Sequence, residues 1–178
     1  CLAVVFALLA VVPALSGTVV ADTPSCDSVT YNGSGTDANP HEIDSVDKLQ
    51  CMGNSSTSTS QSDSFELTQD IDASGTSSWN SGKGFDPIGS YDSPFTGDFD
   101  GNGHEIANLT VDRPNENGIA LFAATKANSG ETTTIESLRL VDINITGLAG
   151  KARTENGGFT LLGGSAGAGY YKHHKLPT

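Results

Sequence analysis

The sequence predicts an all-β fold of short stacked strands and tight turns. Of its 178 residues, 21 are glycine and only 36% are hydrophobic, so the apolar positions are spread too thinly for a helical bundle. A faint repeat is also present, because Gly118-Ile-Ala-Leu-Phe-Ala123 recurs as Gly158-Phe-Thr-Leu-Leu-Gly163. Recurrent strand-and-turn units are typical of solenoids, in which each unit buries its apolar face against its neighbours.

The first 21 residues predict a secretory signal peptide. Leu2 to Val12 are entirely apolar, and Pro13 and small residues follow up to Ala21, so we expect cleavage before Asp22. A retained membrane anchor is the alternative, since Leu2 to Ala21 carries no charge. We expect three further segments, namely a cap region with a polar loop at 22–64, solenoid rungs at 65–169 and a basic tail of different composition at 170–178.

Two cysteines remain in the mature chain, Cys26 and Cys51. In an exported protein they meet an oxidising compartment, which favours a disulfide between them. Two free or metal-bound thiols are the alternative, although His41 is the one other nearby ligand for a metal.

Short amphipathic elements follow in order. Val46, Leu49 and Met52 stand at helical spacing behind Ser45, which predicts one short N-terminal capping helix. Asn54 to Ser64 is a low-complexity polar loop. Alternating apolar residues then predict half-buried strands around 65–71 and 109–112.

The last strand region carries two alternating registers. Leu138 and Leu140 set the first register, and Val141, Ile143 and Ile145 set the second. We interpret the change of register as a β-bulge within one strand.

Several segments resemble exported surface proteins that carry GLUG-type repeats. The resemblance runs from about His41 to Gly164 and is most specific at Phe99-Asp-Gly-Asn-Gly-His104. Its segments are His41-Glu-Ile-Asp-Ser-Val-Asp-Lys-Leu49, Phe65-Glu-Leu-Thr-Gln-Asp-Ile-Asp72, Trp79, Phe85-Asp-Pro-Ile-Gly89 and Phe95-Thr-Gly-Asp-Phe-Asp-Gly-Asn-Gly-His-Glu-Ile-Ala-Asn-Leu109, with the Gly-Leu-Phe-like repeats near 118 and 158. The acidic variant of the pattern is similar to haloarchaeal members. The resemblance implies a right-handed parallel β-helix, often adhesin-like, with no reaction assigned to the repeat. We expect an incomplete solenoid whose last rung is exposed.

The charge excludes one class of partner. The formal net charge is −12, and 20 of the 21 acidic residues lie between Asp22 and Asp142, against five basic ones. A nucleic-acid backbone requires a Lys/Arg surface that this stretch does not have. An acidic, lysine-poor surface is instead typical of proteins that stay soluble in concentrated salt.

Asp98, Asp100, Gly101, Asn102 and Gly103 form the most specific local motif. Their spacing matches the first half of a calcium loop, but position 12 is Leu109, where a bidentate glutamate is required. The alternative, which we favour, is a structural turn in which Asp and Asn cap the backbone and both glycines supply positive φ. We therefore expect no metal site and no small-molecule cofactor.

Paired carboxylates raise an enzymatic alternative. Asp70 with Asp72, or Asp98 with Asp100, could serve glycoside hydrolysis in a carbohydrate-active β-helix. However, the sequence places no histidine or lysine to partner them, and His104 is interpreted as a turn or rung residue. No nucleophile elbow, Walker loop or dinucleotide fingerprint is present.

Four sequons mark candidate glycosylation sites at Asn32, Asn54, Asn108 and Asn144. Asn32 and Asn54 are favoured because their neighbours are loop-like. The sequence as a whole predicts a non-catalytic, secreted or cell-surface module that displays loops. Its expected partners are glycans, other cells or envelope components, with membrane contact only if the N-terminal segment is retained.

Overall fold

The computed structural model describes residues 22–117, 119–127, 133–147 and 169–170. Residues 169 and 170 are described by their backbone only. The signal segment 1–21, the repeat copy at 158–163 and the tail from 171 lie outside the described residues, as does Gly118. Most described strands are two to four residues long. In chain order the elements are η1 (Cys26–Ser28), β1 (His41–Ile43), α1 (Val46–Gln50), β2 (Phe65–Leu67), β3 (Ile71–Asp72), η2 (Ser74–Ser78), α2 (Trp79–Gly82), β4 (Phe99–Asp100), β5 (Glu105–Ala107), β6 (Thr110–Arg113), β7 (Ile135–Glu136), β8 (Arg139–Val141), β9 (Asn144–Gly147) and β10 (Gly169–Tyr170).

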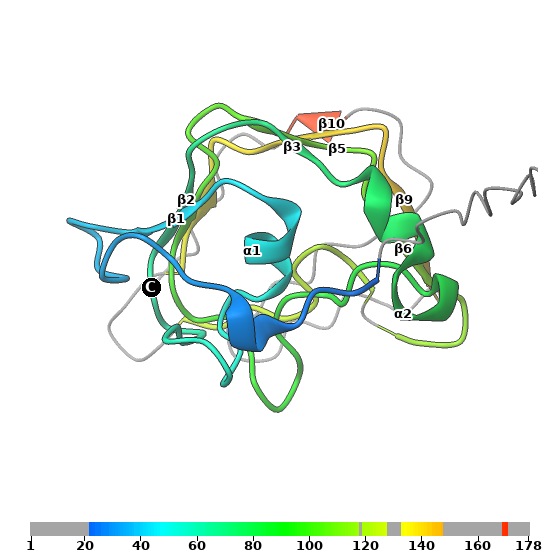
Figure 1. Ribbon diagram of the computed structural model, residues 1–178, viewed down its shortest axis with the longest axis horizontal. Helices are drawn as coiled ribbons and strands as arrows, with labels where there is room; N and C mark the ends of the chain where they lie inside the picture. Colours follow the sequence, from blue (N-terminus) through cyan, green and yellow to red (C-terminus); the bar gives the residue numbers. More distant parts are fainter. Residues whose placement is uncertain (1–21, 118, 128–132, 148–168, 171–178) are drawn as a thin grey trace, which may run out of the picture.

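The described strands form three sheets, with the orders β1-β2-β4-β7, β10-β8-β5-β3 and β6-β9. All pairings are parallel except that of β10 with β8. Figure 1 shows β1 and β2 on one side of a ring of chain, β3 and β5 along the next side, and β6 and β9 on a third. The chain therefore visits the sheets in turn and returns to pair with its own earlier strands.

Successive strands stack in register along each sheet. Phe65 pairs with Phe99 and Phe99 with Ile135, which are repeat distances of 34 and 36 residues. On the second sheet Ile71 pairs with Ile106 and Ile106 with Leu140. Because side chains alternate along a strand, this register stacks the inward-facing apolar residues of successive strands on one another.

The inward side chains of all three sheets pack into one core, which includes Phe65, Ile106 and Val111. Aromatic rings form its largest part. The ring centroid of Phe122 lies 5.3 Å from that of Phe95 and 5.3 Å from that of Phe99. Rings at these separations gain from edge and tilted contacts beyond the burial of their surface.

The short helix predicted behind Ser45 is present as α1. The Ser45 side chain accepts a hydrogen bond from the Lys48 backbone N–H, as an N-cap does, and Leu49 is fully buried. The helix lies within the outline of the ring in Figure 1.

Two expectations about the strands are wrong. Residues 65–71 do not form one strand, since β2 and β3 belong to different sheets. The register change near Val141 is likewise a corner between β8 and β9, and not a bulge. Asp142 at this corner has φ 50°, and Asn108 has φ 59° at the matching corner before β6. Asp and Asn adopt this left-handed conformation more readily than other non-glycine residues, so the chain can turn there.

Tyr31 packs beside this core and predicts an alkaline sensitivity. Its ring contacts His41 and Phe65, and its hydroxyl donates to the Lys48 carbonyl at 2.6 Å. Burial raises the pKa of Tyr31 above its ordinary value, so the unfolded chain releases this proton first. The resulting stability is complete below the ordinary tyrosine pKa of about 10 and is lost as the pH rises above it.

We therefore expect Tyr31→Phe to reduce the loss of stability above about pH 10, at a cost near neutrality of about 1 kcal/mol for the lost hydrogen bond. Urea unfolding between neutral and alkaline pH measures this. Tyr91→Phe is the matched control, because Tyr91 is 89% exposed. An alkaline loss that is the same in parent and Tyr31→Phe would contradict the assignment.

Candidate functional site

Asp98 to Gly103, which we call the turn block, are held in place by three separate features. Asp100 caps the turn by accepting a hydrogen bond from the Asn102 N–H at 2.8 Å. Asn102 and Gly103 take the left-handed conformation, with φ 50° and 79°. Asp98 precedes the turn, and its carboxylate accepts the Thr134 N–H of the next repeat at 2.6 Å. The carboxylates of Asp98 and Asp100 thus hold two different backbone groups.

The expected role of Gly101 is wrong in its mechanism. Gly101 does not have positive φ, and Asn102 takes that conformation in its place. A Cβ on Gly101 would lie 2.6 Å from the Leu138 Cα and 2.6 Å from the Ser137 carbonyl oxygen. Glycine is therefore needed here for the close approach of the next repeat's backbone.

The carboxylate pair Asp70 and Asp72 does have a histidine partner, contrary to the expectation from the sequence. His104 Nδ1 lies 3.1 Å from Asp70 Oδ1, which also accepts the Glu105 N–H. Asp72 is engaged separately by the Asn108 side chain and by the Ser74 N–H and hydroxyl.

These contacts determine the chemistry open to Asp72. The hydrogen bond from the Asn108 amide, followed by those from Ser74, lowers the pKa of the Asp72 carboxyl. A general acid for glycoside hydrolysis needs a raised pKa instead. Asp72 is therefore suited to holding its corner of the chain and poorly suited to donating a proton.

The candidate glycosylation sites differ in their surroundings, although all four asparagines are exposed. The Asn32 side chain donates to Glu42, and the Asn54 side chain accepts from the Ser56 N–H. The Asn108 side chain is held by Asp72 at its corner. Asn144 begins β9, outside the loops that the sequence favoured.

Four carboxylates form a row on the outer face of the first sheet. Glu42 pairs with Glu66, Glu66 with Asp100, and Asp100 with Glu136, each on an adjacent strand. Asn102 donates to the Glu66 carboxylate at 2.9 Å, and Asn32 donates to that of Glu42. Like charges directly opposite one another on neighbouring strands oppose pairing of the strands. We call these four residues the acidic row.

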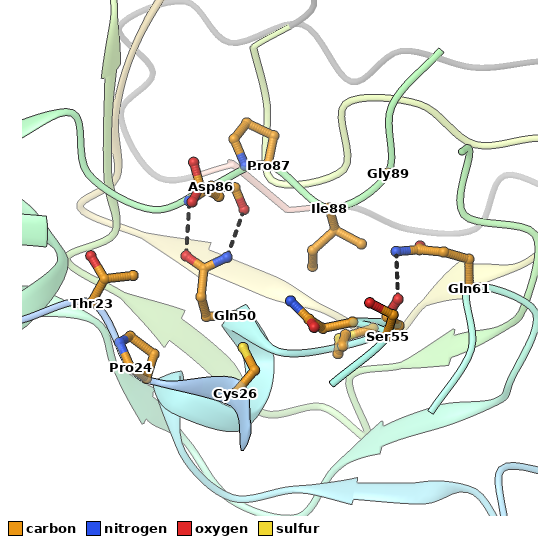
Figure 2. Close-up of a pocket in the computed structure, with 13 residues that line it drawn as sticks. Thr23, Pro24, Cys26, Gln50, Ser55, Gln61, Asp86, Pro87, Ile88 and Gly89 are labelled. Carbon is orange, nitrogen blue, oxygen red and sulfur yellow. Dashed lines mark hydrogen bonds between the residues drawn. The ribbon is translucent and has the colours of Figure 1, made fainter. Parts of the chain in front are cut away.

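A groove of about 370 Å³ lies between the N-terminal segment, the end of α1, the polar loop and residues 86–89. Figure 2 shows Gln50 and Asp86 on one side of this space and Ser55 and Gln61 on the other. The groove is lined by Thr23, Pro24, Cys26, Gln50, Met52, Gly53, Asn54, Ser55, Gln61, Asp86, Pro87, Ile88 and Gly89. We call it the cap groove.

The walls of the cap groove are held together by a disulfide and by two hydrogen bonds. A disulfide joins Cys26 to Cys51, whose Cα atoms are 5.5 Å apart, and so ties the N-terminal segment to α1. These are the two cysteines that the sequence analysis paired. The Gln50 side chain donates to the Asp86 carbonyl at 3.1 Å and accepts the Asp86 N–H at 2.8 Å. The disulfide and these two hydrogen bonds therefore join segments from different walls of the groove.

Asp86 also connects the groove to an arginine. Its carboxylate accepts hydrogen bonds from Arg113 and from the Asn80 side chain. The Arg113 side chain is only 9% exposed, and its other ion pair is with Glu116.

We expect Asp86→Ala to lower the free energy of unfolding by about 2 kcal/mol, because it leaves a nearly buried guanidinium short of a partner. Glu116→Ala removes the more peripheral partner of the same guanidinium and should cost about 0.5 kcal/mol. Urea unfolding of both variants measures the difference, and equal losses would show that Asp86 is not the principal partner.

Sequence reasoning did not identify the cap groove. Its lining comes from segments that lie far apart in the chain. The side-chain amides of Gln50, Asn54 and Gln61 belong to no sequence motif for ligand binding. The one sequence signal is Phe85-Asp-Pro-Ile-Gly89, which belongs to the family resemblance and predicts no site by itself. Within the part of the chain that the structure describes, no cluster of three or more His, Cys, Asp or Glu residues could hold a metal ion. Nor does any described helix combine the length and apolarity needed to cross a membrane.

Comparison with known proteins gives two relatives. The chain is 43% identical to Halomucin of Haloquadratum walsbyi over 136 residues, which are 73% of this chain and 1% of Halomucin. It is also 32% identical to a protein of Evansella cellulosilytica that is named a putative Gly-rich membrane protein. This match extends over 119 residues, which are 67% of this chain and 13% of the Evansella protein. No family model and no solved structure matches. The chain is thus similar to small parts of much longer proteins.

Proposed function

We propose that this chain belongs to an exported, cell-surface β-solenoid with GLUG-type repeats that acts as a non-catalytic display or binding module. The observation that carries the proposal is the in-register stacking of parallel strands from successive repeats on each sheet. A stack of this kind is stiff along its axis and holds its loops at fixed positions. The likeness to Halomucin and to a Gly-rich membrane protein supports a place at the cell envelope.

The acidic row supports the proposal that this module works in concentrated salt. Four stacked carboxylates repel one another in dilute buffer, and dissolved salt screens that repulsion. The overall charge of −12 acts in the same direction.

We therefore expect the free energy of unfolding to rise as salt approaches molar concentration. Glu66→Gln, which removes a charge from the middle of the row, should stabilise the chain by roughly 0.5–1 kcal/mol at low salt and have little effect at molar salt. Thermal melts across a salt series measure both effects. Asp112→Asn is the matched control, because Asp112 is exposed and lies opposite Thr146, not opposite another acid. If Glu66→Gln and Asp112→Asn changed the salt dependence of stability equally, repulsion within the acidic row would not be its cause.

Surface placement is tested in a host grown in molar salt that expresses the chain with an epitope tag. We expect protease added to intact cells to remove the tag while a cytoplasmic marker survives. Protection of the tag until the cells are lysed would contradict surface display. Release of reducing sugar from a polysaccharide panel by the purified chain would contradict the non-catalytic part of the proposal.

A further inference from the structure

The cap groove has the size of a small-molecule site. Its volume of about 370 Å³ falls within the range of ligand-binding pockets, and its shape is fixed by the Cys26–Cys51 disulfide and by the bonds between Gln50 and Asp86. None of its described walls belongs to the turn block, the acidic row or the strand-to-strand contacts of the sheets. Ile88 and Gln61 do bond to the following repeat, but through backbone groups, so stacking does not account for the side chains that line the groove.

The lining selects for the charge of a ligand. Among the described residues that line the groove, none is a lysine, an arginine or a histidine. Its one carboxylate, that of Asp86, is already bonded to Arg113 and Asn80. In a chain of net charge −12, a groove without a cationic side chain disfavours an anion relative to a neutral ligand. Neutral polar groups, namely Asn54, Ser55 and Gln61, face a ligand from the polar loop, and Pro24, Pro87 and Ile88 add apolar surface.

Gln61 supplies the most specific feature of the groove. Its Oε1 atom is buried and has no hydrogen-bond donor among the described residues. Its amide nitrogen reaches the Gly53 carbonyl at only 3.5 Å, as Figure 2 shows by the dashed line from Gln61. Gly53 makes this position possible, since a Cβ there would lie 2.6 Å from Gln61 Nε2. A buried acceptor without a donor is costly, and a small turn of the Gln61 side chain that brings Oε1 to a ligand hydroxyl would remove that cost.

A hydroxyl-rich, neutral molecule fits these features together. Each sugar hydroxyl can donate to Gln61 Oε1 or accept from a side-chain amide, and the carbon face of a sugar ring can rest on proline or isoleucine. We propose that the cap groove binds the end of a neutral saccharide, with Gln61 and Asn54 as its hydrogen-bonding partners. This inference rests on the proposed binding role and locates it in the chain.

The test uses the whole chain in molar salt and four probes, the methyl glycosides of glucose, galactose and mannose and the anion glucuronate. Titrations are followed by the amide signals of isotope-labelled protein. We expect at least one neutral glycoside to give saturable shifts that include the side-chain amides of Gln61 and Asn54, and glucuronate to give none. Saturation by glucuronate alone, or by no neutral probe, would overturn the proposal.

Variants then locate the binding. Ser55→Trp fills the groove without removing a recorded contact and should weaken binding at least about tenfold. Ser58→Trp is its matched control, because Ser58 is exposed in the same loop but does not line the groove. Gln61→Leu should weaken binding about tenfold, the effect of one hydrogen bond, whereas Gln69→Leu, outside the groove, should not.

Equal binding by Ser55→Trp and Ser58→Trp would overturn the site. Melting temperatures of all four variants identify any that are unfolded, and Ser55→Trp alone decides the question if Gln61→Leu does not fold. Protease accessibility on intact cells is measured separately. Surface display without saccharide binding would therefore reject this inference while leaving the proposed function standing.

Discussion

Replacing Cys26 and Cys51 together with alanine is expected to lower the free energy of unfolding by about 3 kcal/mol. The disulfide joins residues that are 25 positions apart, and in the loop-entropy model its loss allows the unfolded chain more conformations. Alanine is the appropriate replacement because Cys51 is fully buried, where a serine hydroxyl would add a cost of its own.

Urea unfolding at constant molar salt measures this loss. Treating the parent with a thiol reductant should lower its stability to about that of the double variant and leave the double variant unchanged. A maleimide should label the native parent only after reduction. A parent that is labelled without reduction, or a double variant as stable as the parent, would contradict a stabilising disulfide.

Gly101→Ala should cost about 3 kcal/mol, and Gly103→Ala only about 1 kcal/mol. The two glycines differ in what a new methyl group would meet. At Gly101 it would collide with the backbone of Ser137 and Leu138, whereas at Gly103 nothing lies within 4 Å. Gly103→Ala therefore carries only the cost of holding alanine at φ 79°.

Thermal melts of the two variants check this order, and Gly103→Asn is the control. Asparagine accepts left-handed φ better than alanine does, so Gly103→Asn should recover part of the loss at that position. Gly101→Asn should recover nothing, because the obstacle there is a collision. A larger loss at Gly103 than at Gly101 would show that conformation, and not contact with the next repeat, limits this turn.

The sequence was sufficient to predict features that depend on neighbouring residues, namely the short helix and the buried faces of the strands. Ser45 with Val46 and Leu49 is sufficient for a capped helical turn, and α1 begins as the pattern indicates but ends at Gln50, two residues before Met52. The alternating apolar residues correctly marked which side chains are buried, among them Phe65, Leu67 and Ile71.

The corners between sheets could not be predicted in this way. A change of apolar register, such as the one near Val141, looks the same in the sequence whether the chain bulges within a strand or ends the strand at a left-handed residue, here Asp142. The difference is decided by the partner strand about 34 residues away, as when β9 pairs with β6 instead of continuing the sheet of β8. The same limit applies to Gly101, whose obstacle lies on the next repeat, and to His104, whose partner Asp70 lies 34 residues earlier.

The acidic row makes one face of the protein a short polyelectrolyte. Adjacent strands lie about 4.8 Å apart, while two unit charges in water must be about 7 Å apart before their interaction falls to the thermal energy. Charges spaced more closely than that hold part of their counterion cloud against dilution. Folding aligns Glu42, Glu66, Asp100 and Glu136 at this spacing, so it should take up cations that the unfolded chain leaves in solution. The stability of the fold would then depend on the logarithm of salt concentration, as the binding of charged polymers does.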